Sequence, residues 1–279
     1  MMSERPGFSV RARVTVLEGS DSVVRRDHLV TEEPLEIRLA AGADRSHVAV
    51  TMRTPGHDFE LAVGYLAGEG VLRDRDDLLR VDYCTDLDVP AGQHYNVVTV
   101  TLNAPRLPEL EQLDRHGFVS SACGVCGKAT LDALAIRAAP IASAELVTLA
   151  TLYTLPEQLR AAQAVFGDTG GLHAAALFTA DGTPLVVRED VGRHNAVDKV
   201  VGHRLLNGGP SPAVLMVSGR TSYEIVQKAV AAGVPIVAGV SAPTSLAVAA
   251  AEEFGVTLAG FVRGERANVY AHPERITSS

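Results

Sequence analysis

The chain has 279 residues and a net charge of −8, with 25 lysines and arginines against 33 aspartates and glutamates. It contains no run of basic residues, which excludes the extended basic face that nucleic-acid-binding proteins normally present. No apolar stretch approaches the ~18 residues that span a bilayer, and Met1 to Val10 lacks the pattern of a signal peptide. The three cysteines, Cys84, Cys123 and Cys126, cannot form a closed disulfide framework. We therefore expect no nucleic-acid partner, no membrane association, and a reducing compartment, the cytoplasm.

The N-terminal part is rich in strand patterns. Alternating or β-branched residues predict strands over Phe8–Val16, His47–Arg53 and Tyr95–Leu102. Before the third of these, Thr54-Pro55-Gly56-His57-Asp58 predicts a turn in which Asp58 caps a helix over Phe59–Ala67. Residues 103–120 hold prolines, charges and a glycine, which is typical of a connector.

The C-terminal part shows a regular order of elements. Ala- and Leu-rich sequence predicts a helix over Lys128–Ala139, and Pro156 suits the first turn of another over Pro156–Phe166. Leu172–Thr179 and Pro184–Arg188 flank the turn Asp181-Gly182, as in a hairpin. Further helices are expected over Val191–Leu206, Ser222–Ala232 and Thr244–Phe254, and strands over Ala213–Val217, Val234–Val240 and Val256–Val262. This alternation predicts right-handed βαβ units on a parallel sheet.

These patterns together predict an α/β protein in two parts. Residues 1–115 form a strand-rich N-terminal subdomain, and residues 116–279 form an α/β domain with the cysteine loop and a ligand site. Only 5% of the residues are aromatic, so the core must consist mainly of Ala, Val and Leu. Such a core suits helices packed on parallel strands.

Three of the predicted strands end in polar loops. These loops are Ser218-Gly219-Arg220, Ser241-Ala242-Pro243 and Arg263-Gly264-Glu265-Arg266. Open α/β sheets bind ligands outside the carboxyl ends of their strands, and arginine holds phosphate by two-point hydrogen bonding. The common nucleotide fingerprints are absent from the sequence. A phosphate-bearing ligand and a set of ordinary turns are both open interpretations.

The segment Cys123-Gly124-Val125-Cys126-Gly127 carries the strongest chemical signal. It precedes the helix predicted from Lys128, and a helix N-terminus and a lysine both lower the pKa of a nearby thiol. The glycines leave the sulfur atoms accessible. Two thiols separated by two residues can exchange a sulfur atom or form a disulfide. We therefore predict that Cys123 and Cys126 carry sulfur chemistry.

Other interpretations of this segment are weaker or remain open. A structural zinc site needs two further ligands at paired spacing, which the chain lacks. A zinc deaminase needs H-x-E before its cysteines, whereas His173 comes after them and is followed by alanines. A dithiol oxidoreductase of the thioredoxin type stays open, although its usual aromatic residue and proline are missing. Cys84 is expected to be a small core residue.

The chain resembles the formate dehydrogenase accessory sulfurtransferase family, FdhD, from about Val30 to Pro273. The resemblance rests on the following segments in this order: Thr54–Asp58, Cys123–Gly127, Thr169–His173, Glu189–Lys199, Ser218–Arg220 and Gly260–Arg266. It implies a C-terminal half similar to the cytidine-deaminase-like fold without its zinc ligands. It also implies a homodimer.

The resemblance further implies a function. Family members take sulfur from a cysteine desulfurase, hold it as a persulfide, and pass it to the molybdenum or tungsten bis-guanine-dinucleotide cofactor of formate dehydrogenase. On this chain the persulfide corresponds to Cys123, with Cys126 as the second catalytic residue. The cofactor, bound as a substrate, corresponds to Phe261, Val262, Arg263, Gly264, Glu265 and Arg266. No metal is expected to be held directly by the protein. A cofactor chaperone without sulfur chemistry is a further alternative.

The segment Glu189–Lys199 leaves its own question open. Asp190 is either the N-cap of the following helix or a residue at the mouth of the cofactor site. The roles of Arg193, His194 and Arg220 are equally open.

Overall fold

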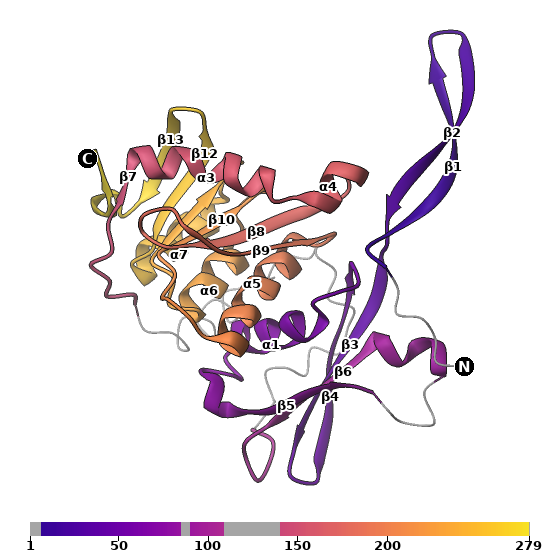
Figure 1. Ribbon diagram of the computed structural model, residues 1–279. Coiled ribbons are helices and arrows are strands. Elements are labelled where there is room, and N and C mark those ends of the chain that lie inside the picture. The colour runs from indigo at the N-terminus through magenta and orange to yellow at the C-terminus, as the bar shows by residue number, and fades with distance from the viewer. Residues whose placement is uncertain (1–6, 85–89, 109–139, 279) are drawn as a thin grey trace.

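The computed structural model describes residues 7–84, 90–108 and 140–278, and its largest sheet has six strands (Figure 1). In spatial order these are β13 (Arg266–Ala271), β12 (Thr257–Arg263), β11 (Ile236–Gly239), β10 (Val214–Val217), β8 (His173–Phe178) and β9 (Pro184–Asp190). The central strands β10, β11 and β12 are parallel, as predicted. The β8–β9 and β12–β13 pairs are antiparallel, because short turns connect them.

Helices cover both faces of this sheet. On one face lie α5 (Arg193–Asn207), α6 (Tyr223–Ala231) and α7 (Ser245–Phe254), and on the other lies α3 (Leu149–Ala161) (Figure 1). Alternate residues of β10 enter two separate cores: Leu215 and Val217 the first, Val214 and Met216 the second. Burial on both faces explains why this strand is apolar throughout.

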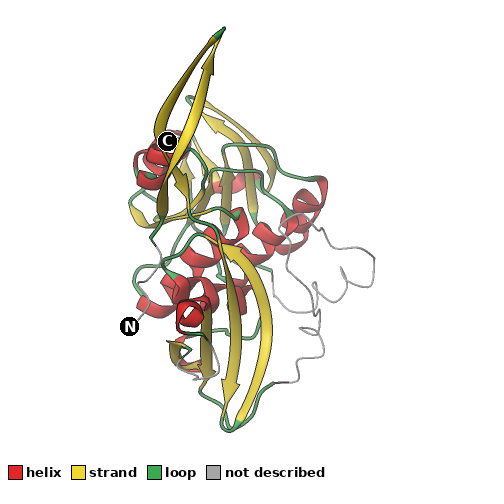
Figure 2. Cartoon of the chain, turned by 90° about the vertical axis from the view of Figure 1, so that its right-hand side faces the viewer, coloured by secondary structure: helices red, strands yellow, loops and turns green. Residues whose placement is uncertain are grey.

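A second sheet of four strands is built from the N-terminal part. Its spatial order is β4 (Asp44–Arg53), β3 (Glu33–Ala41), β6 (Val97–Leu102) and β5 (Leu78–Tyr83). The helix α1 (Asp58–Gly68) lies between this sheet and α5, and Figure 2 shows helices between two strand-rich regions. Leu35 of β3, Leu61 of α1 and Val200 of α5 belong to one buried cluster. The two predicted parts therefore share a core, while the boundary predicted between residues 115 and 116 lies outside the described residues.

The remaining elements are short or stand apart. They are the paired strands β1 (Ser9–Glu18) and β2 (Asp21–Val30), the strands β7 (Val147–Thr148) and β14 (Ile276–Thr277), the helix α4 (Ala164–Thr169), and the 3-10 turns Arg75–Asp77, Ala91–Asn96 and Pro273–Arg275. No described helix combines the length and apolar character that a membrane span requires. The helix predicted over Lys128–Ala139 lies outside the described residues. The similarity to the cytidine-deaminase-like fold stays a prediction.

The prediction that Asp58 caps α1 is wrong. The N-cap is His57, which adopts a left-handed conformation with φ 57° and makes no side-chain cap. The Asp58 carboxylate instead accepts hydrogen bonds from Arg53 and from the Tyr83 hydroxyl, and it is buried. A buried guanidinium is a stronger partner for a carboxylate than free helix amides are.

The helix predicted over Pro156–Phe166 exists, but its predicted bounds are wrong. The helix α3 begins at Leu149, where the Thr148 side chain accepts a hydrogen bond from the Thr151 amide. Pro156 therefore lies inside α3, and the chain breaks after Ala161 before α4 starts at Ala164. The Thr148 cap and the buried Leu152 and Leu155 outweigh the proline.

Two glycines allow α1 and α5 to cross in close contact. A Cβ placed on Gly64 would lie 1.8 Å from the Asp198 carbonyl oxygen, and one on Gly202 would lie 1.8 Å from the Glu60 carbonyl oxygen. No residue that has a Cβ atom fits either position unless one of the helices moves. This crossing joins the two sheets into one body.

We expect Gly202→Ala to destabilise the protein by about 3 kcal/mol or more, because the added methyl group overlaps backbone that cannot move away. Gly167→Ala in α4 is the matched control, since a Cβ there meets nothing within 4 Å. The control should change stability by less than about 0.5 kcal/mol. Urea unfolding of both variants provides the measurement, and equal midpoints would contradict the close crossing.

Candidate functional site

The three polar loops predicted at the strand ends lie along one edge of the six-stranded sheet. The loop after β10 and the loop after β11 pair through Thr221 and Pro243. The Thr221 amide donates to the Ala242 carbonyl over 3.2 Å, and the Phe261 amide of β12 donates to the Ser241 carbonyl over 3.1 Å. The loops are therefore held together by backbone hydrogen bonds.

Two glycines allow these loops to pack closely. A Cβ on Gly239 would lie 2.8 Å from Thr221 Oγ1, and one on Gly260 would lie 2.9 Å from the Pro243 ring. Thr221 itself is fully buried. The edge is thus a compact structure rather than a set of independent turns.

The same edge carries the beginning of β8 and the end of β9. Because β8 is antiparallel to β10, His173 lies beside the loop after β10, and it pairs with Asp190 of β9. The Ala174 amide donates to Ser218 Oγ over 2.9 Å. A Cβ on Gly219 would lie 3.2 Å from His173 Nδ1. Desolvation, followed by the nearby Arg193 charge, lowers the pKa of His173.

His194 follows on the first turn of α5 and contacts α6. Its Nε2 atom lies 2.8 Å from Ser222 Oγ and 3.3 Å from Glu224 Oε2. Desolvation, assisted by the Arg193 and Lys228 charges, lowers the pKa of His194 to about 3, so the ring is neutral at physiological pH. Desolvation raises the pKa of Glu224.

The electrostatic character of this edge is positive. The helices α5, α6 and α7 begin directly after strands that end there, so each directs its N-terminal amides and partial positive charge toward the edge. Four arginines belong to the same loops and helix start: Arg193, Arg220, Arg263 and Arg266. In a chain with net charge −8, this concentration of positive groups suits an anionic ligand.

The predicted cofactor segment forms the end of β12 and the turn into β13. Phe261 has a left-handed backbone with φ 52°, and Val262 is fully buried. Arg263 pairs with Arg266 across a tight turn in which Gly264 has φ 53°. Arg263, Gly264, Glu265 and Arg266 are exposed. Both arginine side chains are therefore exposed to solvent at the edge.

The predicted catalytic residues Cys123 and Cys126 lie outside the described residues, and their roles stay predictions. Cys84 follows β5 directly and is buried, as expected for a core residue.

The segment Glu189–Lys199 proves to be a buried anchor. Asp190 is fully buried; its Oδ2 atom accepts from the Thr54 amide over 3.1 Å and lies 2.7 Å from Lys199 Nζ. Its Oδ1 atom accepts from the Gly192 amide and from the Asn195 side chain. The alternative that Asp190 is the N-cap of α5 is wrong, because Gly192 holds that position.

The rest of this anchor binds the N-terminal sheet and α6. Lys199 donates to the Thr54 carbonyl over 3.0 Å, and Asn195 donates to the Met52 carbonyl over 2.7 Å. Asp198 pairs with Lys228 of α6 at 2.6 Å, and burial raises the pKa of Asp198 to about 6. Asp190, Asn195 and Lys199 thus fix the start of α5, and this places Arg193 and His194 at the sheet edge.

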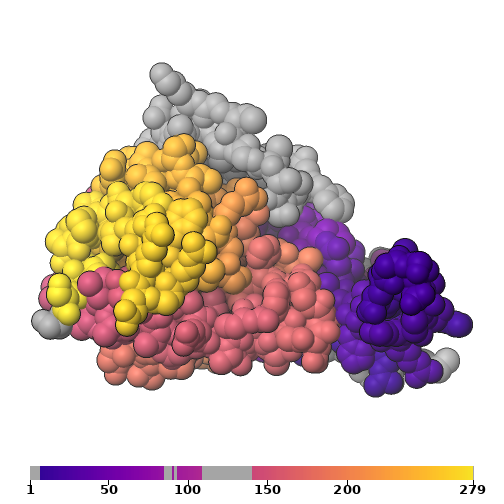
Figure 3. Space-filling view, turned by 90° about the horizontal axis from the view of Figure 1, so that it is seen from above, coloured from indigo at the N-terminus to yellow at the C-terminus, as the bar shows by residue number. Residues whose placement is uncertain are grey.

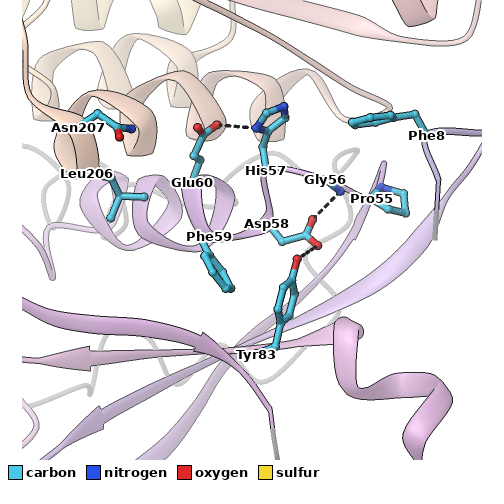
Figure 4. Close-up of a pocket in the computed structure, with 10 residues that line it drawn as sticks. All are labelled: Phe8, Pro55, Gly56, His57, Asp58, Phe59, Glu60, Tyr83, Leu206 and Asn207. Atoms are coloured by element: carbon cyan, nitrogen blue, oxygen red, sulfur yellow. Dashed lines mark hydrogen bonds and ion pairs between the residues drawn. The ribbon is translucent and has the colours of Figure 1, made fainter. Parts of the chain in front are cut away.

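A separate pocket lies at the other end of α5. It has a volume of about 520 Å³ and is lined by Phe8, Pro55, Gly56, His57, Asp58, Phe59, Glu60, Tyr83, Leu206 and Asn207 (Figure 4). Figure 4 shows His57 directed toward Glu60, and Asp58 toward Tyr83 and Gly56. Although burial opposes ionisation, hydrogen bonds from Arg188 and His203 hold the pKa of Glu60 below its ordinary value. No residue from Phe261 to Arg266 lines this pocket, so it is distinct from the sheet edge.

Sequence reasoning missed several polar residues of the sheet edge. Ser222, Glu224 and His173 had no assigned role, although His173 and the segment after Asp190 belong to the motifs noted above. The signal that could have marked them is their place near predicted strand ends: His173 is the second residue of one predicted strand, and Ser222 and Glu224 begin the helix predicted after the Ser218–Arg220 loop.

These features define a class: an α/β protein with a mixed sheet whose carboxyl edge is electropositive. The chain belongs to the FdhD/NarQ family, whose sequence model matches residues 30–277.

Individual relatives agree with this assignment. The chain is 53% identical to the sulfur carrier protein FdhD of Mycolicibacterium paratuberculosis over 271 residues, which cover 95% of this chain and 98% of the relative. It is 52% identical to the sulfur carrier protein FdhD of Streptomyces coelicolor, with 95% and 94% covered. A crystal structure of a formate dehydrogenase accessory protein from Desulfotalea psychrophila shares the fold, with a TM-score of 0.76 at 24% identity, and 96% and 99% covered.

We predict that acidification destabilises the wild-type protein through His194. Its pKa falls from 6.5 to about 3 on folding. Between these two pH values the ring is protonated in the unfolded chain and neutral in the folded chain. Stability is therefore present above pH 6.5 and is lost as the pH falls toward 3. At about 1.4 kcal/mol per pH unit, up to about 2 kcal/mol disappears between pH 6.5 and pH 5.

Urea unfolding of wild type and His194→Gln at both pH values measures this effect. The variant keeps a hydrogen-bonding group near Ser222 but has no titrating ring, so its stability should fall less. An identical pH dependence of the two proteins would show that His194 is not held neutral.

Proposed function

We propose that this protein is a persulfide-carrying sulfurtransferase for the molybdenum or tungsten bis-guanine-dinucleotide cofactor of formate dehydrogenase. The observation that carries the proposal is the Cys123–Gly127 segment in a chain that is 53% identical, over nearly its full length, to a protein named a sulfur carrier. The cofactor is the substrate and belongs to the dehydrogenase. The three cysteines cannot form a closed disulfide framework, which favours a reducing compartment, the cytoplasm, for this protein.

The first step is sulfur acceptance from a cysteine desulfurase. The Cys123 thiolate attacks the terminal sulfur of the persulfide on the desulfurase. A sulfur–sulfur bond forms on Cys123, and the desulfurase cysteine leaves as a thiolate, so no net oxidation occurs. A lowered thiol pKa favours this attack.

The second step is delivery of the sulfur atom. The Cys126 thiolate attacks Cys123 Sγ, and the terminal sulfur leaves as hydrosulfide toward the metal of the bound cofactor. The two cysteines supply the two electrons and become a disulfide, which a cellular dithiol reduces again. This step assigns Cys126 a resolving role.

The electropositive sheet edge supports the cofactor part of the proposal. A guanine dinucleotide carries phosphates, and Arg263 and Arg266 project at an edge where three helices begin. The exposed turn around Gly264 allows backbone amides to approach a phosphate oxygen. Arg193 and Arg220 extend the positive surface along the same edge.

We expect Cys123→Ala to abolish activation of formate dehydrogenase in cells that lack their own sulfur carrier, because no other group replaces the thiol. Cys126→Ala should impair activation less completely. Cys84→Ala is the matched control, since this buried cysteine lies outside the loop. Full activation by Cys123→Ala would contradict the persulfide and would instead favour a cofactor chaperone without sulfur chemistry.

We also expect the double variant Arg263→Ala/Arg266→Ala to bind GDP about 100-fold more weakly, since each charge-assisted hydrogen bond contributes ~1.5–3 kcal/mol. GDP represents one half of the cofactor. Arg73→Ala/Arg80→Ala removes two exposed arginines of the N-terminal part and should leave the affinity unchanged. If a folded Arg263→Ala/Arg266→Ala variant bound GDP with unchanged affinity, this would contradict the assignment and favour the Ser218–Arg220 loop as the binding site.

A further inference from the structure

The segment Thr54–Asp58 has no part in the proposed sulfur transfer, although it is one of the motifs noted in the sequence. Its residues Pro55, Gly56, His57 and Asp58 line the pocket at the end of α5 that lies away from the sheet edge (Figure 4). The pocket volume of about 520 Å³ falls within the ~300–1,000 Å³ that is typical of small-molecule sites. The segment therefore builds a cavity with room for a small molecule.

The backbone of this segment is strained at His57. The residue has φ 57° and ψ 30°, a left-handed conformation that few residues other than glycine adopt. Two hydrogen bonds hold it there: the Leu61 amide donates to the His57 carbonyl over 2.9 Å, and the Gly56 amide donates to Asp58 Oδ1 over 3.1 Å. Residues kept in such conformations cluster at functional sites, which makes the pocket a candidate for binding.

The Asp58 carboxylate organises the pocket wall and is fully occupied. Its Oδ1 atom accepts from Arg53 Nε over 3.1 Å and from the Gly56 amide. Its Oδ2 atom accepts from Arg53 Nη2 over 3.4 Å and from the Tyr83 hydroxyl over 2.9 Å. Each oxygen atom thus has two hydrogen-bond donors, so Asp58 has no strong acceptor position left for a ligand.

The Glu60 carboxylate is occupied in the same way. Arg188 donates to both of its oxygen atoms, and His203 Nδ1 lies 2.9 Å from Oε1. The second oxygen atom, Oε2, lies 3.4 Å from His57 Nδ1. Both carboxylates of the pocket therefore have an arginine partner. Because burying an unbalanced charge is costly, the pocket favours a neutral ligand over an ion.

The His57 imidazole is the polar group that remains for a ligand. Desolvation, followed by the Arg188 charge, lowers the pKa of His57, so the ring is neutral at physiological pH. The Glu60 carboxylate beside Nδ1 favours the tautomer with the proton on that atom. The Nε2 atom then has a lone pair, and no residue in the described part of the chain forms a hydrogen bond with it. His57 is thus an acceptor for a ligand N–H group.

Aromatic rings form the apolar part of the pocket. The Phe59 and Tyr83 rings pack together with centroids 4.7 Å apart, and the Phe8 ring lies 6.3 Å from the His57 ring. Phe8 precedes β1 directly, where the β1–β2 ribbon leaves the body (Figures 1 and 3), and its carbonyl accepts from the Thr31 amide over 2.9 Å. Aromatic faces of this kind pack well against a planar ring.

We propose that this pocket binds a neutral, planar heteroaromatic molecule whose ring N–H group donates a hydrogen bond to His57 Nε2. The aromatic side chains contact the ring of the ligand, and the occupied carboxylates keep the pocket in shape without attracting a cation. The pocket is separate from the sheet edge, and the proposal does not rest on the proposed sulfur transfer.

Binding of indole to the full chain tests this proposal. The chain contains no tryptophan, so indole fluorescence reports binding without a tryptophan background. We expect a dissociation constant below ~1 mM for this small probe. Benzothiophene has the same two-ring shape without the N–H group, and it should compete about tenfold more weakly because it cannot donate to His57. An excess of GDP should not displace indole, since GDP is assigned to the sheet edge.

Two pairs of proteins separate the hydrogen bond from simple apolar contact. His57→Gly keeps the left-handed backbone, which glycine adopts freely, and removes the imidazole. This variant should bind indole about tenfold more weakly and lose the preference for indole over benzothiophene. Phe8→Ala should also weaken indole binding several-fold. Phe166→Ala is its matched control, because this partly buried aromatic residue of α4 does not line the pocket.

Circular dichroism verifies that each variant is folded. The proposal is overturned if the wild-type chain does not bind indole at millimolar concentration, or if GDP displaces it. It is also overturned if His57→Gly keeps the preference for indole over benzothiophene, since the N–H group would then have another partner. Equal effects of Phe8→Ala and Phe166→Ala would show that indole binds elsewhere and would equally reject it.

Discussion

The buried ion pair between Asp190 and Lys199 holds the two sheets of this protein in their relative position. Asp190 ends β9 of the large sheet, and both members of the pair bind the backbone of Thr54, which continues from β4 of the small sheet. Burying two charges is costly unless every polar atom around them is satisfied, and here amides and carbonyls complete the network. Removing one partner of such a pair typically costs ~3–5 kcal/mol.

The functional edge depends on this anchor. Because Asp190 and Lys199 fix the first two turns of α5, Arg193 and His194 are held beside His173 and the loop that follows β10. The crossing at Gly64 and Gly202 continues the same constraint along the helix, since it allows α1 to support α5 from the side of the small sheet. Although the chain is acidic overall, it therefore has a positively charged edge on which Arg193, His194 and His173 keep fixed relative positions. Preorganised charges of this kind bind an anionic ligand without a large cost of ordering.

The sequence predicted the large sheet better than the small one. The regular order of strands, helices and polar loops from Leu172 onward established the parallel centre, and hence that the loops at Ser218, Ser241 and Arg263 share one edge. The strands β2, β3 and β5 were not predicted, and the hairpin partner β13 was missed after Gly264. For β3 the alternation of Leu35, Ile37 and Leu39 is visible in retrospect. In β2 the consecutive pairs Val23-Val24 and Arg25-Arg26 obscure the period, because this strand is exposed on both faces.

The polar residues could not be assigned from the sequence for a different reason. Asp190 and Thr54 are 136 positions apart, and Asn195 and Met52 are 143 apart, so no local pattern predicts their contacts. Asp58 looked like a helix cap because its partners Arg53 and Tyr83 come from two other strands of the fold. Local rules describe what a residue can do, whereas tertiary contacts decide which partner it finds.

The central claim is that Cys123 carries sulfur, and intact-protein mass spectrometry tests it most directly. The purified chain is incubated with a cysteine desulfurase and cysteine, and its mass is compared with that of Cys123→Ala treated in the same way. The account predicts that the wild-type chain gains the mass of one sulfur atom, that a thiol reductant removes it, and that the variant gains none at this position. A wild-type chain that stays unmodified while the desulfurase turns over, or a variant that is modified equally, would contradict it.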